Sequence, residues 1–140
     1  MRQPQRQKVS RSEGQALVEF ALLLPLFLML LFGMIDFGRA YSASVTQTNA
    51  AREGARLGVT GATQSAIVTR SQSTSANSCN NGNPSVAVQG AQGASGTDVV
   101  VTVSCSLNLI TPLAGIIKLV TGGAFQGTIP LSSSATMRIE

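Results

Sequence analysis

The chain has 140 residues, of which 44% are hydrophobic and only 11% are charged. Ten Lys and Arg against six Asp and Glu give a formal net charge of +4 at pH 7. The length allows one small domain. The chain has no His, the commonest general base and metal ligand, and its two Cys are too few for a four-cysteine zinc site. Four of the ten basic residues lie in the first eleven positions, which argues against a basic nucleic-acid-binding face.

The composition changes abruptly after a basic leader, residues 1–14. Residues 16–38 are apolar apart from Glu19 and Asp36. As a helix this stretch would be about 35 Å long, enough to cross a hydrocarbon core of about 30 Å. A buried core helix is the alternative, but so short a chain can hardly cover one on all sides. Because the basic flank precedes the span, the positive-inside rule predicts a single membrane span with the N-terminus in the cytoplasm and the C-terminus outside.

Residues 39–58 contain no Pro and mix small, polar and charged side chains. They predict that the same helix continues into water, so that one long helix covers residues 15–58 and ends within 58–61, where glycines oppose helix. Glu53 and Arg56 are spaced for a weak ion pair along this helix. An exposed helix of this length needs a partner along its apolar surface.

Residues 59–140 predict a small extracytoplasmic head of the α+β class, with an antiparallel sheet and a covering helix. The strongest strand signal is the β-branched run at 97–107, whose alternation predicts one buried face. The residues of that face are Val99, Val101, Val103, Cys105 and Leu107. The other predicted elements are a short helix within 63–72, a turn at 80–84, a strand at 85–89, a helix at 111–120, and one or two strands within 128–140, where Pro130 indicates an edge or a strand start.

Cys79 and Cys105 both fall in the part predicted to lie outside the cytoplasm, where a disulfide is the natural expectation. The bond would close a loop of roughly 25 residues and add about 3 kcal/mol by chain entropy. Two free thiols are the alternative. No C-x-x-C pair is present, so a redox role is not indicated.

The junction between the leader and the apolar run carries the sharpest motif. Gly14 is followed directly by Gln15, and Glu19 and Phe20 open the apolar stretch. This pattern resembles the signal of type IV pilins and their relatives, which a prepilin peptidase cuts after the glycine. The resemblance implies a processing site made of these four residues. The apolar segment would stay on the mature protein, whereas an ordinary secretory signal would be lost.

Glu19 places a carboxylate inside an apolar segment, which costs several kcal/mol unless a partner is found. Cleavage after Gly14 would create an α-amino group at Gln15. In pilin-like assemblies the glutamate at this position is thought to meet the N-terminal amine of a subunit, which implies that Glu19 sets the register of assembly. The alternative is a carboxylate that reaches the nearby headgroups.

Three stretches narrow the resemblance, namely GQALVEFALLLPLFLMLLFGMIDFGRA, NAAREGARLGV and the C-terminal LSSSATMRIE. They resemble the TadE-like family, the pseudopilins of tight-adherence (Tad, Flp-type) pilus systems, most strongly over residues 12–59. The resemblance implies a pilin-like fold and a structural protein of the bacterial cytoplasmic membrane, with no catalytic residue, metal or cofactor. Its implied partners are membrane lipid before assembly, pilin or pseudopilin subunits, a prepilin peptidase and the Tad assembly platform.

Two other functions remain open beside a pseudopilin or minor pilin that takes part in assembly of a surface adhesion pilus. The low charge and the Ser-, Thr- and Gly-rich head also suit the major subunit of a self-assembling filament. A bitopic envelope protein that is never cut, and that acts as a binding module, is the third hypothesis.

Three further features of the long helix have two interpretations each. Pro25 removes one helical hydrogen bond and favours a bend that helps assembly, or is merely a tolerated kink. Asp36 forms a local ion pair with Arg39, or an intersubunit contact. Gly54 and Gly58 form a spacing that permits close helix approach, although such spacings often arise by chance.

Overall fold

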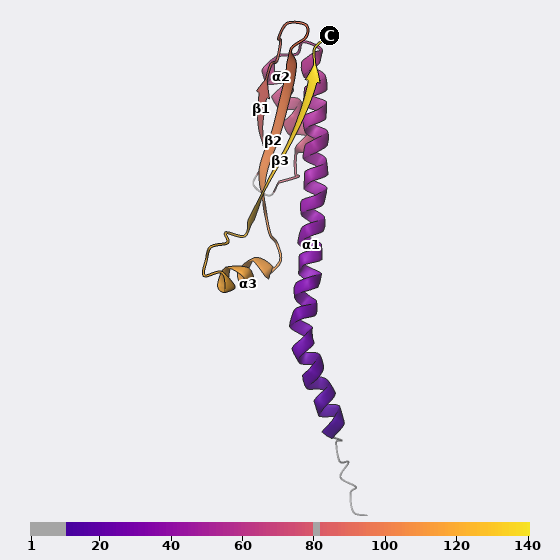
Figure 1. Cartoon of the computed structure of the whole chain (residues 1–140), viewed down its shortest axis with the longest axis vertical. Coiled ribbons are helices and arrows are strands. Elements are labelled where there is room, and N and C mark those ends of the chain that lie inside the picture. Colours follow the sequence, from indigo (N-terminus) through magenta and orange to yellow (C-terminus); the bar gives the residue numbers. More distant parts are fainter. Residues whose placement is uncertain (1–10, 80–81) are drawn as a thin grey trace, which may run out of the picture.

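A computed structural model describes residues 11–79 and 82–140 and shows a long helix joined to a small head (Figure 1). Its elements are α1 (Arg11–Val59), α2 (Gln64–Ser75), β1 (Ser85–Gln89), β2 (Asp98–Asn108), α3 (Leu113–Val120) and β3 (Thr128–Arg138). The predicted α+β fold with a long N-terminal helix is confirmed. Residues 1–10 of the predicted leader and residues 80–81 of the predicted turn lie outside the described residues.

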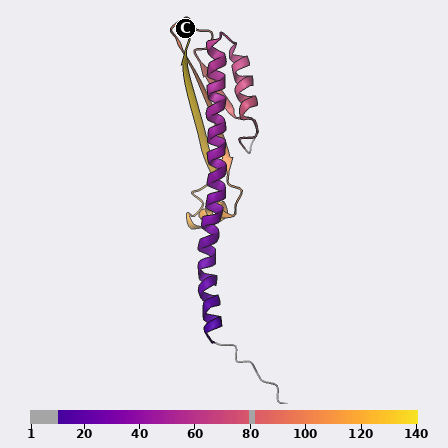
Figure 2. The same ribbon diagram turned by 90° about the vertical axis from the view of Figure 1, so that its right-hand side faces the viewer.

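The helix α1 begins at Arg11, four residues before the predicted start, and ends at Val59, within the predicted interval. It runs through Pro25 without a break. The C-terminal half of α1 lies along the head, and its N-terminal half extends beyond the head with no other described element beside most of it (Figures 1 and 2). The apolar run and the head-packing run are therefore consecutive parts of one rod.

The sheet has three antiparallel strands in the order β1-β2-β3. Val86 of β1 pairs with Val103 of β2, and Val101 of β2 pairs with Ala135 of β3. The last segment forms one strand of eleven residues. It lies at an edge, as Pro130 predicted, because a residue without an N–H is tolerated where one side of the strand is unpaired.

One face of the sheet is covered by α1 and α2, which lie side by side against it (Figure 2). The predicted buried face of β2 is confirmed for Val99, Val101 and Val103, which are fully buried, and for Leu107, whereas Cys105 is only partly buried. The core cluster consists of Ala50, Ala51, Ala55, Ile67, Val99, Val101 and Val103. The small alanines of α1 and the β-branched side chains of β2 allow the helix to approach the sheet closely.

At Gly54 and Gly58 α1 packs tightly against the rest of the head. A Cβ atom added at Gly54 would lie 2.2 Å from Ser71 Oγ, and one added at Gly58 would lie 2.6 Å from Val99 Cγ1. The glycine spacing thus serves packing inside the head, against α2 and β2. In the sequence this spacing was indistinguishable from a chance pattern.

Alanine at Gly54 is expected to destabilise the head by about 1–2 kcal/mol. The overpacking cost of about 1–3 kcal/mol outweighs the gain of up to about 1 kcal/mol in helix propensity. Gly38→Ala is the matched control, because a Cβ there meets nothing within 4 Å and only the propensity gain remains. Amide hydrogen exchange of β2 peptides in detergent-solubilised protein measures both effects.

A second substitution tests the cause of that destabilisation. Ser71 Oγ is buried and has no hydrogen-bond partner among the described residues, so Ser71→Ala alone is expected to be neutral or slightly stabilising. Combined with Gly54→Ala, it should restore most of the lost protection, because it removes the nearest clashing atom. A double variant as unstable as Gly54→Ala alone would show that the clash with Ser71 is not the cause.

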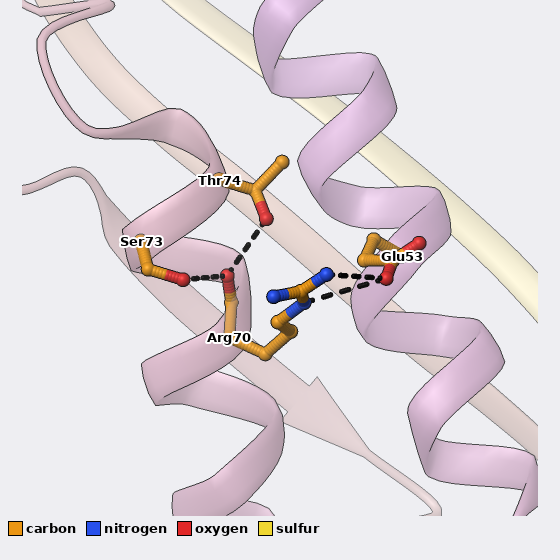
Figure 3. A network of polar contacts seen from close by, with 4 residues as sticks. All are labelled: Glu53, Arg70, Ser73 and Thr74. Carbon is orange, nitrogen blue, oxygen red and sulfur yellow. Dashed lines mark hydrogen bonds and ion pairs between the residues drawn. The ribbon is translucent and has the colours of Figure 1, made fainter.

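The predicted ion pair between Glu53 and Arg56 is wrong, because Glu53 has a different partner. Glu53 instead pairs with Arg70 of α2, whose Nη2 and Nε lie 2.9 Å and 3.3 Å from Glu53 Oε1 (Figure 3). The backbone oxygen of Arg70 also accepts hydrogen bonds from the hydroxyls of Ser73 and Thr74. Both charged side chains are exposed, so the pair contributes at most about 1 kcal/mol and mainly aligns α2 on α1.

Candidate processing and assembly site

The predicted cleavage junction lies in the first turns of α1, where Gly14 and Gln15 are exposed. Gln15 Nε2 donates a hydrogen bond to Glu19 Oε1 at 3.2 Å, one helical turn away. A peptidase that binds its substrate extended would have to unwind this turn, and a glycine lowers the cost of unwinding by up to about 1 kcal/mol relative to alanine. Accessibility and local helix weakness thus coincide at the Gly14–Gln15 bond.

The apolar run of α1 is uncovered. Its most apolar stretch of 18 residues has a mean hydropathy of 2.4, and none of that stretch is buried. Phe20 is 63% exposed and Leu22 is 75% exposed. By length and composition α1 is a helix that can cross a membrane. Because burying one Leu or Phe side chain contributes about 1.5–3 kcal/mol, this surface strongly favours lipid or other helices around it.

Two of the predicted site residues, Pro25 and Glu19, therefore lie on the exposed, apolar part of α1. Among the four predicted processing residues, Gln15 and Glu19 make a direct contact, because they lie one helical turn apart. Phe20 lies in the same segment, and its side chain is exposed. What Glu19 and Pro25 do depends on whatever packs against α1.

Asp36 is buried and contacts a distant segment of the chain, which the sequence did not predict. It is only 3% exposed, and its carboxylate accepts hydrogen bonds from the backbone N–H of Ile110, at 3.2 Å, and from the hydroxyl of Thr111. The predicted pairing with Arg39 is present, at 3.8 Å between Nη1 and Oδ1. Arg39 also donates to the backbone oxygen of Asn108 at 3.3 Å.

The carboxylate of Asp36 thus ties the end of the apolar run to the segment that leads from β2 into α3. The sequence does not indicate this contact, because Ile110 and Thr111 lie 74 and 75 positions away and carry no motif. The one signal in the sequence was a carboxylate near the end of a long apolar run, where a charge needs a specific partner.

The predicted disulfide between Cys79 and Cys105 is confirmed, with an S–S distance of 2.05 Å, and the alternative of free thiols is wrong. It joins the loop after α2 to β2. Gln47 of α1 is fully buried beside it, with Nε2 at 2.7 Å from Cys105 Sγ and 3.6 Å from Cys79 Sγ. The bond therefore stands where α1, β2 and the loop after α2 meet.

The described residues hold no group of His, Cys, Asp and Glu that is suited to a metal ion. A groove of about 270 Å³ lies between α1 and the loop after α2. Its lining residues are Arg39, Ser42, Ala43, Thr46, Ala76, Asn77, Ser78 and Leu107. This lining offers hydroxyls and one cation but no carboxylate or imidazole that would act as a base.

Comparison with known protein families gives one match, to the family described as TadE-like protein, over residues 14–56. The match begins at Gly14, covers most of α1 and includes none of the sheet. No significant match was found among curated proteins or among solved structures. The resemblance seen at the C-terminus stays a prediction. Over residues 14–56 the resemblance is confirmed: this part of the chain is similar to the family described as TadE-like protein.

Proposed function

We propose that the chain is a pseudopilin or minor pilin that takes part in assembly of a Tad-type surface adhesion pilus. A prepilin peptidase cuts it after Gly14, and the mature protein is held in the cytoplasmic membrane by α1 with the head outside. Assembly moves the apolar surface of α1 from lipid to neighbouring pilin helices, with Glu19 paired to the α-amine of a neighbouring subunit's Gln15.

One observation carries this proposal: the TadE-like segment coincides with an apolar helix that has no partner in the chain itself. A helix of this kind needs an external apolar environment at every stage, which lipid supplies first and other pilin helices supply later. The disulfide of the head supports its place outside the cytoplasm, where such bonds form and persist.

The charge balance agrees with this order of events. The leader, residues 1–14, carries four basic residues and one acid, which is +3 of the total of +4. The remaining chain has six basic and five acidic residues and a net charge of +1. The basic character therefore belongs to insertion and processing, and it leaves with the leader.

Mass spectrometry of the N-terminus of the membrane-bound protein tests processing directly. We expect a mature chain that starts at Gln15. Gly14→Leu should retain the leader and lower the processed fraction at least about tenfold, because a bulky side chain at the cleaved position hinders the extended fit that glycine permits. Gly33→Leu is the matched control, since Gly33 is another helical glycine of α1 with nothing within 4 Å of an added Cβ.

A different N-terminal residue of the mature chain would favour a different function. A wild-type chain that keeps Met1 or begins at Arg2 would contradict processing and favour an uncleaved bitopic protein. A start after Ala40 or Ser44 would mean a secreted protein. Abundance of the mature chain in sheared filaments would favour the major subunit, and scarcity there an accessory role.

A further inference from the structure

The head exposes large apolar side chains in one place only among the described residues. Outside α1, the large hydrophobic side chains that are exposed are Ile110 at 61%, Leu119 at 84% and Val120 at 80%. All three belong to the excursion between β2 and β3, which contains α3. No residue of α3 is buried. A surface this apolar at one end of an otherwise polar head needs an occupant.

The fold fixes where this excursion lies along α1. Asp36 binds Ile110 and Thr111, so the entry to α3 is held at the end of the apolar run 16–38. From that point α3 runs crosswise to α1 and away from it, beyond the end of the sheet (Figure 1). If α1 spans the membrane through its apolar run, α3 lies at the level where the outer leaflet meets water.

The composition of α3 is typical of a helix at the boundary between the outer leaflet and water. Its sequence LAGIIKLV is apolar except for Lys118, which is exposed. Lys118 is also the one charged residue between Asp98 and Arg138. Amphipathic helices that lie in the interface place apolar side chains at the boundary of headgroups and acyl chains and keep a Lys near the phosphates.

We propose that α3 and Ile110 form a second membrane contact, a short helix that lies in the outer leaflet interface of a membrane with anionic phospholipid. Leu119 and Val120 insert among the upper acyl chains, and Lys118 faces the headgroups. The occupant is lipid because Asp36 holds the entry to α3 at the end of the apolar run of α1, where preceding side chains such as Leu31 and Ile35 are exposed as well.

This contact would orient the head as well as anchor it. With α1 as the only anchor, the head tilts whenever α1 tilts. A second contact, tied to α1 through Asp36, limits this tilt. The head would then stand at a defined angle to the membrane.

The inference rests on α1 spanning the membrane, and the test separates the two claims. The chain has no Trp, so one Trp introduced at a chosen site reports that site alone. Full-length Leu119→Trp protein is reconstituted at high lipid-to-protein ratio in phosphatidylethanolamine and phosphatidylglycerol vesicles that contain brominated lipids. Phe27→Trp, within the apolar run of α1, reports the span, and Ser134→Trp, exposed on β3, reports the water-exposed head.

We expect lipids brominated near the headgroups to quench Trp at position 119 at least about threefold more than Trp at position 134, and more than lipids brominated near the chain ends do. Val120→Trp should behave as Leu119→Trp does. Quenching of Phe27→Trp together with a position 119 that matches position 134 would overturn the second contact alone. Absence of quenching at position 27 would overturn the span itself. Emission at position 119 that changes with protein density, without lipid quenching, would assign α3 to a protein neighbour and refute lipid contact.

Discussion

Replacing Cys79 and Cys105 together by alanine is expected to lower the free energy of unfolding of the head by about 3.5 kcal/mol. The two residues are 26 positions apart, and a cross-link over a loop of that length removes about this much chain entropy from the unfolded state. Small domains are stable by about 5–15 kcal/mol in total, so the loss would be a large share. Urea unfolding of the detergent-solubilised chain, followed by hydrogen exchange of β2 peptides, measures it.

The wild-type protein treated with reductant is the matched control for the double alanine variant, since it breaks the same bond and keeps the side chains. Both should lose protection to a similar extent in β2 and in the loop after α2. The apolar run of α1 in detergent should be unaffected, because it makes few contacts with the head (Figure 1). A double variant as stable as the oxidised wild type would show that the remaining core holds this loop without the bond.

Much of the fold was predictable because its signals are local. The buried face of β2 follows from alternation over a few residues, and the edge position of β3 follows from Pro130. The length of α1 follows from the apolar run 16–38 and the Pro-free run 39–58, which are consecutive in the sequence. The end of α1 follows from the glycines within 58–61. The disulfide was predictable because only one pairing of two cysteines exists.

The parts that sequence analysis missed depend on contacts between distant segments. The partner of Glu53 is Arg70, 17 positions away, because α2 folds back onto α1 and brings Arg70 within hydrogen-bond distance. Asp36 finds its donors in a segment more than 70 positions later. Such partners follow from how α2 and the segment after β2 pack against α1, which the sequence alone left open.

The role of Glu19 in assembly stays a prediction, although its local contact with Gln15 follows from the sequence. Glu19 and Gln15 meet because they are one helical turn apart, which any helix over this segment would give. The intersubunit role of Glu19 depends on a neighbour that the single chain does not contain. For that residue, resemblance to pilins supplies the hypothesis and a variant has to test it.

Replacing Glu19 by alanine is expected to leave the protein in the membrane fraction and to reduce piliation at least about tenfold. Insertion should be unimpaired, because removal of a carboxylate from an apolar run lowers the free energy of inserting that run into the membrane. Assembly should suffer because the α-amine of the neighbouring subunit's Gln15 would be buried without its counter-charge, and a tenfold change needs a loss of only about 1.4 kcal/mol. Electron microscopy of piliated cells and the yield of sheared pili measure the effect, and the mass of the mature chain shows whether cleavage still occurs.

Two matched variants separate charge pairing from the local hydrogen bond that Gln15 Nε2 donates to Glu19 Oε1. Glu19→Gln keeps a polar side chain but no charge, and should assemble nearly as poorly as Glu19→Ala. Gln15→Ala removes the side-chain donor but keeps the α-amine after cleavage, and should assemble almost normally. If Glu19→Ala is cleaved and piliates like the wild type, its carboxylate serves the headgroups alone and sets no register. If Gln15→Ala fails as badly as Glu19→Ala, the intrachain hydrogen bond, and not the intersubunit amine, is the interaction that assembly requires.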